Sequence, residues 1–412
     1  MKKKVLMIAQ GFYPEIGSAG NRMKNIYKLL WENGYEVHIL TTEPTYPNKK
    51  LYEDKKFWDE EGSFNNEFIN RVKIANRKYS RSLFNRLFYY LEMAFKLFFL
   101  VLKDKQKYDV IFVSSPPIFV GFVGVVAKYK YKCPLITEIR DLWPESLKGV
   151  GVFNYNWIIN TFSYFERFLY KQSEHIIVNS GGFKSYIIEK SGVAPKKIGF
   201  MPNSALLKEI PQSKDPSSRK KFKVIYTGNI GLAQDIDVLK KLAFCLDEQD
   251  IPLSMVGYGM KKQEFIDFVA KNKLANVTFH SPTTRRECLE LNLAHDVGFV
   301  SLNDSQVFNT VLPGKIIDYM TCGLPIVASV DGYAKEIIER ESLGFVSESR
   351  NIDEIVNHIV FLKTNPALRE SISKNAIQFI KKHFLWEKNI YELISRIEEN
   401  NEPKEGKGII NE

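Results

Sequence analysis

Strand-like and helix-like patterns of apolar residues alternate from the start of the chain. The apolar run Val5–Ala9 predicts a buried strand, and apolar residues from Met23 to Trp31 then recur at helical spacing until Gly34. Val37–Thr41 predicts the next strand, which completes a strand-helix-strand unit. The alternation returns around three further strand patterns, Val110–Val113, Leu135–Ile139 and Ile176–Val178. This order predicts a parallel, doubly wound sheet.

The second half of the chain repeats this alternation after a polar interruption. Ser204–Lys223 is rich in Lys, Ser and Pro, shows little hydrophobic period and is typical of a linker or surface loop. Strand patterns follow at Val224–Tyr226, Leu253–Val256, Val277–Phe279, Val297–Ser301 and Ile326–Ser329. Helix-length segments such as Lys261–Asn272 and Gly314–Thr321 separate them. We therefore predict an α/β fold of two Rossmann-like domains, residues 1–203 and 204–383.

Length and composition agree with two domains and add a preference for anionic partners. The chain has 412 residues, 44% of them hydrophobic, and single cores stop growing at about 250–300 residues. Its formal net charge of +10 favours nucleic acid, anionic lipid or phosphorylated small molecules. The four cysteines show neither zinc-site pairs nor a disulfide framework. No stretch approaches the ~20 uncharged apolar residues of a spanning helix, and the charged residues 400–412 predict a disordered tail.

Three glycine turns stand at the ends of predicted strands. Gly17-Ser18-Ala19-Gly20 follows the first strand, and Gly228-Asn229-Ile230-Gly231 holds the equivalent place in the second domain. Such turns let the backbone approach an anion at a helix start, although a tight strand-to-helix turn explains the same glycines. The third turn, Gly257-Tyr258-Gly259, lacks the last glycine of a dinucleotide fingerprint. The turns indicate a phosphate group but do not identify its carrier.

The strongest local signal is the segment Leu312-Pro313-Gly314-Lys315, which opens a helical pattern that includes Asp318. Lys315 and Asp318 are three residues apart, so on a helix they share a face near its N-terminus. There a cation and a carboxylate can meet a diphosphate and a ribose. A surface ion pair between the two side chains is the simpler alternative.

A second signal follows directly after a predicted strand, at Glu138-Ile139-Arg140-Asp141 and on to Ser146. The carboxyl ends of strands in an open α/β sheet face the ligand crevice. A structural Arg140–Asp141 pair remains an alternative. Asp235 and Asp237 could hold a divalent metal, but their place at a helix start favours Asp235 as the N-cap. No metal and no other cofactor are predicted.

Five segments, taken in order, resemble the family-four retaining glycosyltransferases of GT-B fold, especially the branch that builds bacterial surface polysaccharides. They are Tyr13–Gly20, Glu138–Ser146, Tyr226–Gly231, Val256–Gly259 and Leu312–Met320, within a resemblance from about Lys4 to Trp386. The resemblance implies two domains facing a central cleft, with the donor nucleotide held mainly by the C-terminal domain. It implies an acceptor held mainly by the N-terminal domain, and a last helix, residues 384–399, that crosses back to the N-terminal domain.

The chain departs from the family pattern at three places. Members commonly carry two glutamates separated by seven residues; the second corresponds to Asp318 and the first to Thr310, which has no carboxylate. The Arg and Lys that follow the glycine turn in many members are missing from Gly231–Asp235. Arg140 replaces a histidine. Lys315 therefore becomes the candidate to offset the diphosphate charge, and Asp318 the candidate for the ribose hydroxyls.

The resemblance implies metal-independent transfer of a hexosyl or N-acetylaminosugar unit from a nucleotide-diphosphate donor, for which we expect a UDP-sugar. The acceptor is expected to be lipid-linked, at the cytoplasmic face of the plasma membrane. We expect catalytic roles for Glu138, Arg140 and Asp141. The expected donor-binding residues are Gly17, Ser18, Ala19, Gly20, Gly228, Asn229, Gly231, Gly257, Tyr258, Gly259, Leu312, Pro313, Gly314, Lys315 and Asp318. The alternatives are a nucleotide-sugar epimerase of the same fold and a basic nucleic-acid-binding protein.

The cationic segment Arg71–Lys107 predicts a contact with an anionic membrane. Its apolar residues recur mostly at helical spacing and give an aromatic face beside a basic one, the profile of an interfacial helix. The residues expected at the membrane are Arg81, Arg86, Phe95, Phe98 and Phe99. A core helix of the first domain with its basic side in water is the alternative.

Overall fold

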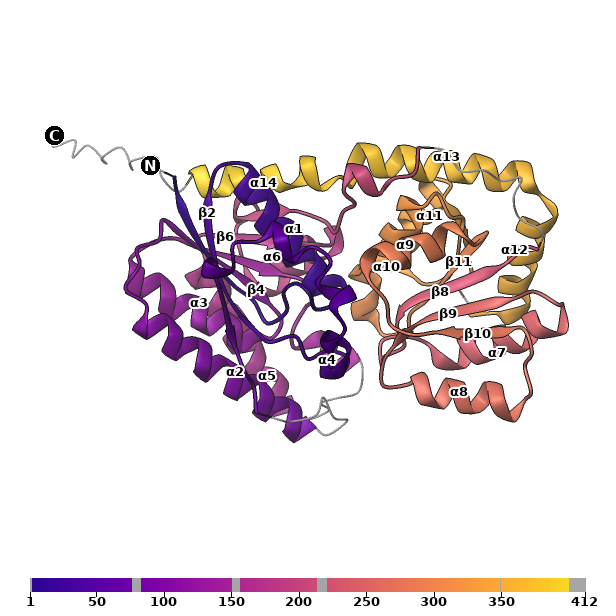
Figure 1. The fold of residues 1–412 in the computed structure, drawn as a ribbon, viewed down its shortest axis with the longest axis horizontal. Helices are drawn as coiled ribbons and strands as arrows, with labels where there is room; N and C mark the ends of the chain where they lie inside the picture. Colours follow the sequence, from indigo (N-terminus) through magenta and orange to yellow (C-terminus); the bar gives the residue numbers. More distant parts are fainter. Residues whose placement is uncertain (1, 76–82, 150–155, 213–220, 349, 400–412) are drawn as a thin grey trace.

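The computed structural model describes residues 2–75, 83–149, 156–212, 221–348 and 350–399. These residues form a seven-stranded parallel sheet in the first half of the chain and a six-stranded parallel sheet in the second half (Figure 1). In the first sheet the order is β3-β2-β1-β4-β5-β6-β7. These strands are β1 (Lys4–Ile8), β2 (Glu36–Thr42), β3 (Ile69–Val72), β4 (Val110–Ser115), β5 (Leu135–Ile139), β6 (His175–Val178) and β7 (Ile198–Phe200).

The second sheet has the order β10-β9-β8-β11-β12-β13. Its strands are β8 (Val224–Asn229), β9 (Leu253–Tyr258), β10 (Val277–His280), β11 (Val297–Ser301), β12 (Ile326–Ser329) and β13 (Gly344–Val346). In both sheets the first three strands run outward in one direction, and the fourth returns to the other side of the first strand, as in doubly wound folds. The predicted fold class, two Rossmann-like α/β domains, is therefore confirmed.

Helices cover both faces of the first sheet. They are α1 (Ser18–Glu32), α2 (Leu83–Lys103), α3 (Ile118–Tyr131), α4 (Glu145–Gly149), α5 (Asn156–Gln172) and α6 (Gly181–Ser191). The turn before α1 requires its glycines, because Gly17 has φ +108° and a Cβ at Gly20 would collide with the Glu15 carbonyl. This backbone turn places the N-terminus of α1 at the carboxyl end of β1.

The second sheet is covered by α7 (Ile236–Glu248), α8 (Lys262–Lys271), α9 (Arg285–Leu293), α10 (Gly314–Thr321), α11 (Gly332–Arg340), α12 (Ile352–Thr364) and α13 (Pro366–His383). The last helix, α14 (Trp386–Glu399), lies along the first domain beside α1 (Figure 1). Its apolar residues Trp386, Ile390, Leu393 and Ile397 are buried in the core that includes Met23 and Ile26 of α1.

The chain passes between the domains twice, and the two passages are paired. The Ala205 N–H donates to the Phe384 carbonyl at 2.9 Å, and the Trp386 N–H donates to the Ala205 carbonyl at 2.9 Å. The first passage continues into a short 3₁₀ turn, η6 (Leu207–Glu209). The domain limits at residues 203 and 383 remain predictions, and the predicted tail at 400–412 lies outside the described residues.

The structure corrects the start of the predicted membrane segment. Arg71 belongs to β3, where its Nη2 donates to the Tyr13 carbonyl at 2.7 Å and its guanidinium lies over the rings of Phe12 and Trp58. This cation is held inside the first domain, so its assignment to a membrane-facing surface is wrong. Among the described residues, no helix combines the length and apolar character needed to span a bilayer.

Candidate functional site

A cavity of about 970 Å³ lies between the two domains, at the carboxyl ends of strands from both sheets. Its first wall comes from the loops after β1, β5 and β6, and its second from the turns after β8 and β9 and the start of α10. Open α/β sheets bind ligands at this edge. The predicted central cleft is therefore present.

The first glycine turn contributes Gly17, Ser18 and Gly20 to the cavity wall, whereas Ala19 is not among the described lining residues. Ser18 Oγ accepts a hydrogen bond from Asn203 Nδ2 at 3.3 Å. Across the cavity, Gly314 of α10 is close enough that an added Cβ would lie 3.5 Å from Ser18 Oγ. The starts of α1 and α10 thus approach each other, so an anion between them would meet two helix N-termini.

Behind the first wall, a buried polar network joins Arg22 of α1 to the end of β5. Arg22 Nε donates to Glu138 Oε1 at 2.7 Å, and Ser114 Oγ donates to Glu138 Oε2 at 2.6 Å. Arg22 also donates to the Asn203 side chain at 3.3 Å and to the Met201 carbonyl at 2.6 Å. Glu138 is fully buried and lies behind the described residues that line the cavity. Glu138 is therefore placed to orient Arg22 and Ser114 and not to contact a substrate.

Arg140 and Asp141 line the cavity, as expected for residues at a strand end. Arg140 Nε donates to Ser114 Oγ at 2.7 Å and Arg140 Nη2 to the Pro116 carbonyl at 2.9 Å, which fixes the guanidinium in place. Burial lowers the pKa of Arg140 and raises the pKa of Asp141 to about 6. A carboxyl group that titrates near neutrality, next to a fixed cation, can act on a reacting sugar or acceptor.

On the second wall the turns after β8 and β9 pack directly on each other. Gly228, Asn229, Gly257 and Tyr258 line the cavity, while Gly231 and Gly259 are outside the set of described lining residues. A Cβ at Gly257 would collide with the Gly228 carbonyl, so the closeness of two backbones explains this glycine. Tyr258 also reaches the first domain, where its ring meets that of Tyr46 edge-on at 5.2 Å.

Lys315 is a buried cation in the cavity wall. Its Nζ lies 3.6 Å from the centre of the Tyr226 ring, and the described part of the chain offers it no hydrogen-bond acceptor. Burial lowers the pKa of Lys315 to about 7, against the opposing influence of Asp318. Pro313 and Gly314 line the cavity beside it, and Leu312 is buried in the core. A lysine at a helix N-terminus whose ammonium has no hydrogen-bond acceptor among the described residues is well placed to meet a phosphate.

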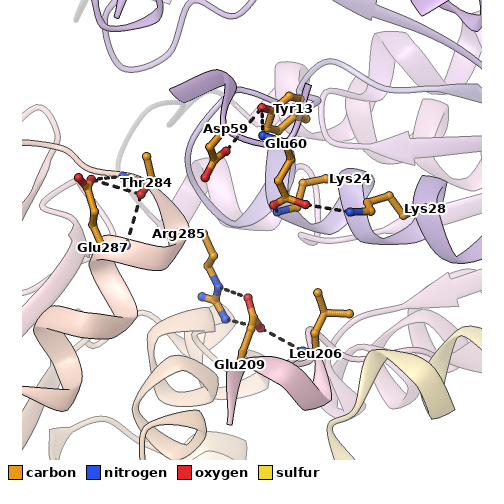
Figure 2. A network of polar contacts seen from close by, with 10 residues as sticks. All are labelled: Tyr13, Lys24, Lys28, Asp59, Glu60, Leu206, Glu209, Thr284, Arg285 and Glu287. Atoms are coloured by element: carbon orange, nitrogen blue, oxygen red, sulfur yellow. Dashed lines mark hydrogen bonds and ion pairs between the residues drawn. The ribbon is translucent and has the colours of Figure 1, made fainter. Parts of the chain in front are cut away.

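The alternative of a Lys315–Asp318 ion pair is wrong, because Asp318 pairs with Arg285. Arg285 Nη1 donates to Asp318 Oδ1, and the other side of the guanidinium holds Glu209 with bonds of 3.0 and 3.3 Å (Figure 2). Burial raises the pKa of Asp318, and Arg285 counters this. Arg285 and Glu209 lie in no motif and are 76 residues apart in the chain, so no sequence pattern indicated them.

The first-domain side of the cavity also carries an acidic and aromatic wall (Figure 2). Glu60 receives Lys24 at 2.5 Å and Lys28 at 2.9 Å. Burial opposes ionisation of Glu60, but the two lysines outweigh it and lower its pKa to about 2. Asp59 is exposed beside the Tyr13 hydroxyl. Aromatic rings with hydrogen-bonding carboxylates suit the apolar faces and hydroxyl groups of a sugar.

Asp235 is the N-cap of α7, as predicted. Its Oδ1 accepts the N–H groups of Asp237 and Val238, both at 3.1 Å. The Asp237 side chain points to solvent with 79% of its surface exposed, so the two carboxylates do not converge. Within the described ranges, no three His, Cys, Asp or Glu side chains are grouped to hold a metal ion.

Helix α2 has two apolar faces. Tyr89, Met93, Leu97 and Val101 are buried against the first sheet, whereas Phe88, Leu91, Phe95, Phe99 and Leu102 are exposed. Of the residues expected at the membrane, Phe95 is 63% exposed and Phe99 40%. Phe98 is half-buried, packs against the core and meets the ring of Phe99 at 5.5 Å, so its membrane contact stays a prediction. Arg86 is half-buried, and Arg81 lies outside the described residues.

Residues 17–204 match the model described as "Glycosyl transferase 4-like domain", and residues 208–379 match "Glycosyl transferases group 1". Escherichia coli WcaI, named as a colanic acid biosynthesis glycosyl transferase, is 22% identical over 81% of this chain and 84% of its own.

Two solved structures share the fold over nearly the whole chain. Sucrose-phosphate synthase of Thermosynechococcus elongatus superposes with a TM-score of 0.74 at 15% identity, over 97% of this chain and 99% of the other. Anabaena HepE, solved with UDP and glucose, gives a TM-score of 0.69 at 17% identity, over 96% and 100%. The two family models together cover most of the chain, one on each side of the cavity. The chain therefore belongs to the group 1, glycosyl transferase 4-like family of glycosyltransferases and has the GT-B fold.

Proposed function

We propose that this chain is a retaining, metal-independent transferase that moves a hexosyl or N-acetylaminosugar unit from a UDP-sugar to a lipid-linked acceptor in bacterial surface-polysaccharide synthesis. The observation that carries the proposal is Lys315 at the start of α10, which meets no hydrogen-bond acceptor in the described part of the chain and lines the same cavity as Arg140 and Asp141. A diphosphate would supply the anion that Lys315 lacks. The UDP bound by HepE and the pathway in the name of WcaI support the donor and the product class.

In the proposed reaction the bond between the sugar and the diphosphate breaks, and the acceptor oxygen attacks from the same face. The leaving diphosphate oxygen takes the acceptor proton, so no protein nucleophile is needed. Lys315 and the starts of α1 and α10 stabilise the charge that grows on the diphosphate. Arg140 and Asp141 orient the sugar and acceptor, and Glu138 acts through Arg22 and Ser114 as a positioning residue.

The test is transfer from a panel of UDP-sugars to an undecaprenyl-diphosphate-linked sugar acceptor. The product's anomeric configuration, read by NMR, should match that of the donor. An inverted product would refute retention. Conversion of the nucleotide sugar to a new free nucleotide sugar without acceptor would instead establish the epimerase alternative.

We also propose that the first domain docks on an anionic membrane surface through α2 and α5. Helices α2, α3 and α5 lie together on one side of the first sheet (Figure 1). Helix α5, which packs on α3 as α2 does, also exposes Trp157, by 70%, and Tyr164, by 64%. Exposed aromatic clusters of this kind mark interaction surfaces, and nearby Lys and Arg side chains attract anionic headgroups by about 1 kcal/mol each.

Vesicle co-sedimentation tests this docking. Binding should require anionic lipid, weaken with salt, and fall when Phe88, Phe95 and Phe99 are changed to Ser. Phe244→Ser with Phe361→Ser is the matched control, because those rings are 40% and 48% exposed but lie on α7 and α12 of the second domain. Equal pelleting of wild type and the α2 variant, or equal binding to neutral vesicles, contradicts the proposal.

A further inference from the structure

Asn179 occupies a neighbouring position to Arg140 at the carboxyl edge of the first sheet. Strands β5 and β6 pair in parallel, with Ile139 opposite Val178 as the last pair. The next residues of the two strands, Arg140 and Asn179, therefore leave the sheet side by side. Both line the cavity. Asn179 lies in no recognisable motif, so it was not among the residues predicted for the site.

The Asn179 side chain is half-buried, and its amide oxygen has no hydrogen-bond partner among the described residues. Its Oδ1 is shielded from solvent and meets no hydrogen-bond donor among the residues that the structure describes. Buried amide oxygens are ordinarily hydrogen-bonded, so a rotation of the half-buried Asn179 side chain would turn this oxygen to a ligand hydroxyl in the cavity that it lines. The neighbouring groups are already used, because Arg140 donates to Ser114 and Pro116, and the Ser180 hydroxyl donates to the Thr310 carbonyl.

Thr310 cannot supply the sugar contact from the second domain. Its hydroxyl turns back to the Val307 carbonyl at 2.7 Å. Its backbone packs on Gly182 at the start of α6, where an added Cβ would lie 2.7 Å from the Thr310 Cα. Thr310 is also outside the group of described residues that line the cavity. Thr310 is used instead to join the two domains.

We propose that Asn179 determines donor-sugar specificity, with its amide oxygen accepting a hydrogen bond from a ring hydroxyl of the transferred sugar. This inference rests on the proposed function. It places the sugar contact on the first domain while Lys315 of the second domain holds the diphosphate. The correct sugar would then contact both walls of the cavity at once, and a sugar without the matching hydroxyl would contact only one.

The experiment compares binding of UDP and UDP-sugars by calorimetry. The probes are UDP, UDP-glucose, UDP-galactose and UDP-N-acetylglucosamine, and the sugar that wild type binds most tightly is then tested as its monodeoxy analogues. Asn179→Ala should leave the Kd for UDP within about twofold and weaken that UDP-sugar by about 3–10-fold, the range for one hydrogen bond. One deoxy analogue should bind wild type and Asn179→Ala equally, which identifies the hydroxyl.

Ser180→Ala is the matched control. It removes the neighbouring hydroxyl that bonds to Thr310 at the domain interface, so any loosening of the domains should affect UDP and UDP-sugar alike. If wild type binds neither UDP nor any UDP-sugar, the proposed function fails. If wild type binds them and Asn179→Ala, or Asn179→Ser should the alanine variant misfold, leaves the UDP-sugar affinity unchanged, the Asn179 inference alone is overturned.

Discussion

Lys315→Met should make the ligand-free protein more stable while weakening nucleotide binding. The lysine Nζ is buried over Tyr226 without an acceptor among the described side chains, and burial lowers its pKa from 10.5 to about 7. At about 1.4 kcal/mol per pH unit, this shift sets a ceiling of about 5 kcal/mol on the cost of the buried ammonium. Water in the open cavity screens part of it, so we expect a gain of about 2 kcal/mol.

The sign of the effect follows from the direction of the pKa shift. A lysine whose pKa is lower in the folded state does not reduce the free energy of unfolding at a pH above its unfolded pKa, because it is neutral in both states. The destabilisation grows as pH falls from 10.5 to about 7. The stabilisation by Met should therefore be full at pH 6.5 and shrink towards pH 10. Methionine keeps the contact with the Tyr226 ring, so packing loss is small.

Nucleotide binding should favour wild type over the Met variant, in contrast to the stability of the ligand-free protein. UDP would hold Lys315 protonated, so its Kd for wild type should rise above pH 7 by up to about tenfold per unit, whereas the Met variant should give a flat profile. At pH 7 the variant should bind UDP about 10- to 100-fold more weakly, the worth of a charge-assisted contact. Urea unfolding and calorimetry at pH 6.5 to 9.5 measure both effects. If the Kd for UDP is equal for wild type and the Met variant and changes with pH in the same way, Lys315 does not bind the diphosphate.

Three further predictions concern other parts of the site. Asp141→Asn should lower kcat more than it lowers donor affinity. Because burial raises the Asp141 pKa to about 6, the kcat of wild type should fall below that pH, whereas the kcat of the variant should not change there. An unchanged kcat in the variant would indicate that Arg140 and Asp141 form only a structural pair. Arg285→Met should weaken UDP binding and destabilise the fold by about 3 kcal/mol, because it leaves the Glu209 and Asp318 carboxylates without their cation. Urea unfolding midpoints and calorimetry measure the two effects. Wild-type values in both would show that Arg285 does not hold these carboxylates in place. Chelator should leave the initial transfer rate unchanged, and rescue of a lost rate by manganese would contradict metal independence.

The sequence by itself determined the class of fold and most of the central strands. Leu135–Ile139, Val297–Ser301 and Ile326–Ser329 match the predicted limits, because buried parallel strands appear as continuous apolar runs. The strands it missed, β3, β7 and β13, lie at the sheet edges and have only three or four residues. Edge strands are partly exposed, so their composition does not separate them from loops.

Local motifs likewise placed Lys315 and Arg140 at the site, because a glycine turn or helix start fixes the position of its own side chains. The partners of those side chains depended on tertiary structure. Arg285 meets Glu209 from 76 residues away, and Arg22 meets Glu138 from 116 residues away. Asn179 reaches Arg140 only through the register of β5 with β6. Crossover connections between strands bring such groups together. Because these connections vary in length, the spacing of the paired residues follows no pattern in the sequence. Only the folded chain therefore decides which charges are paired and which remain available to a ligand.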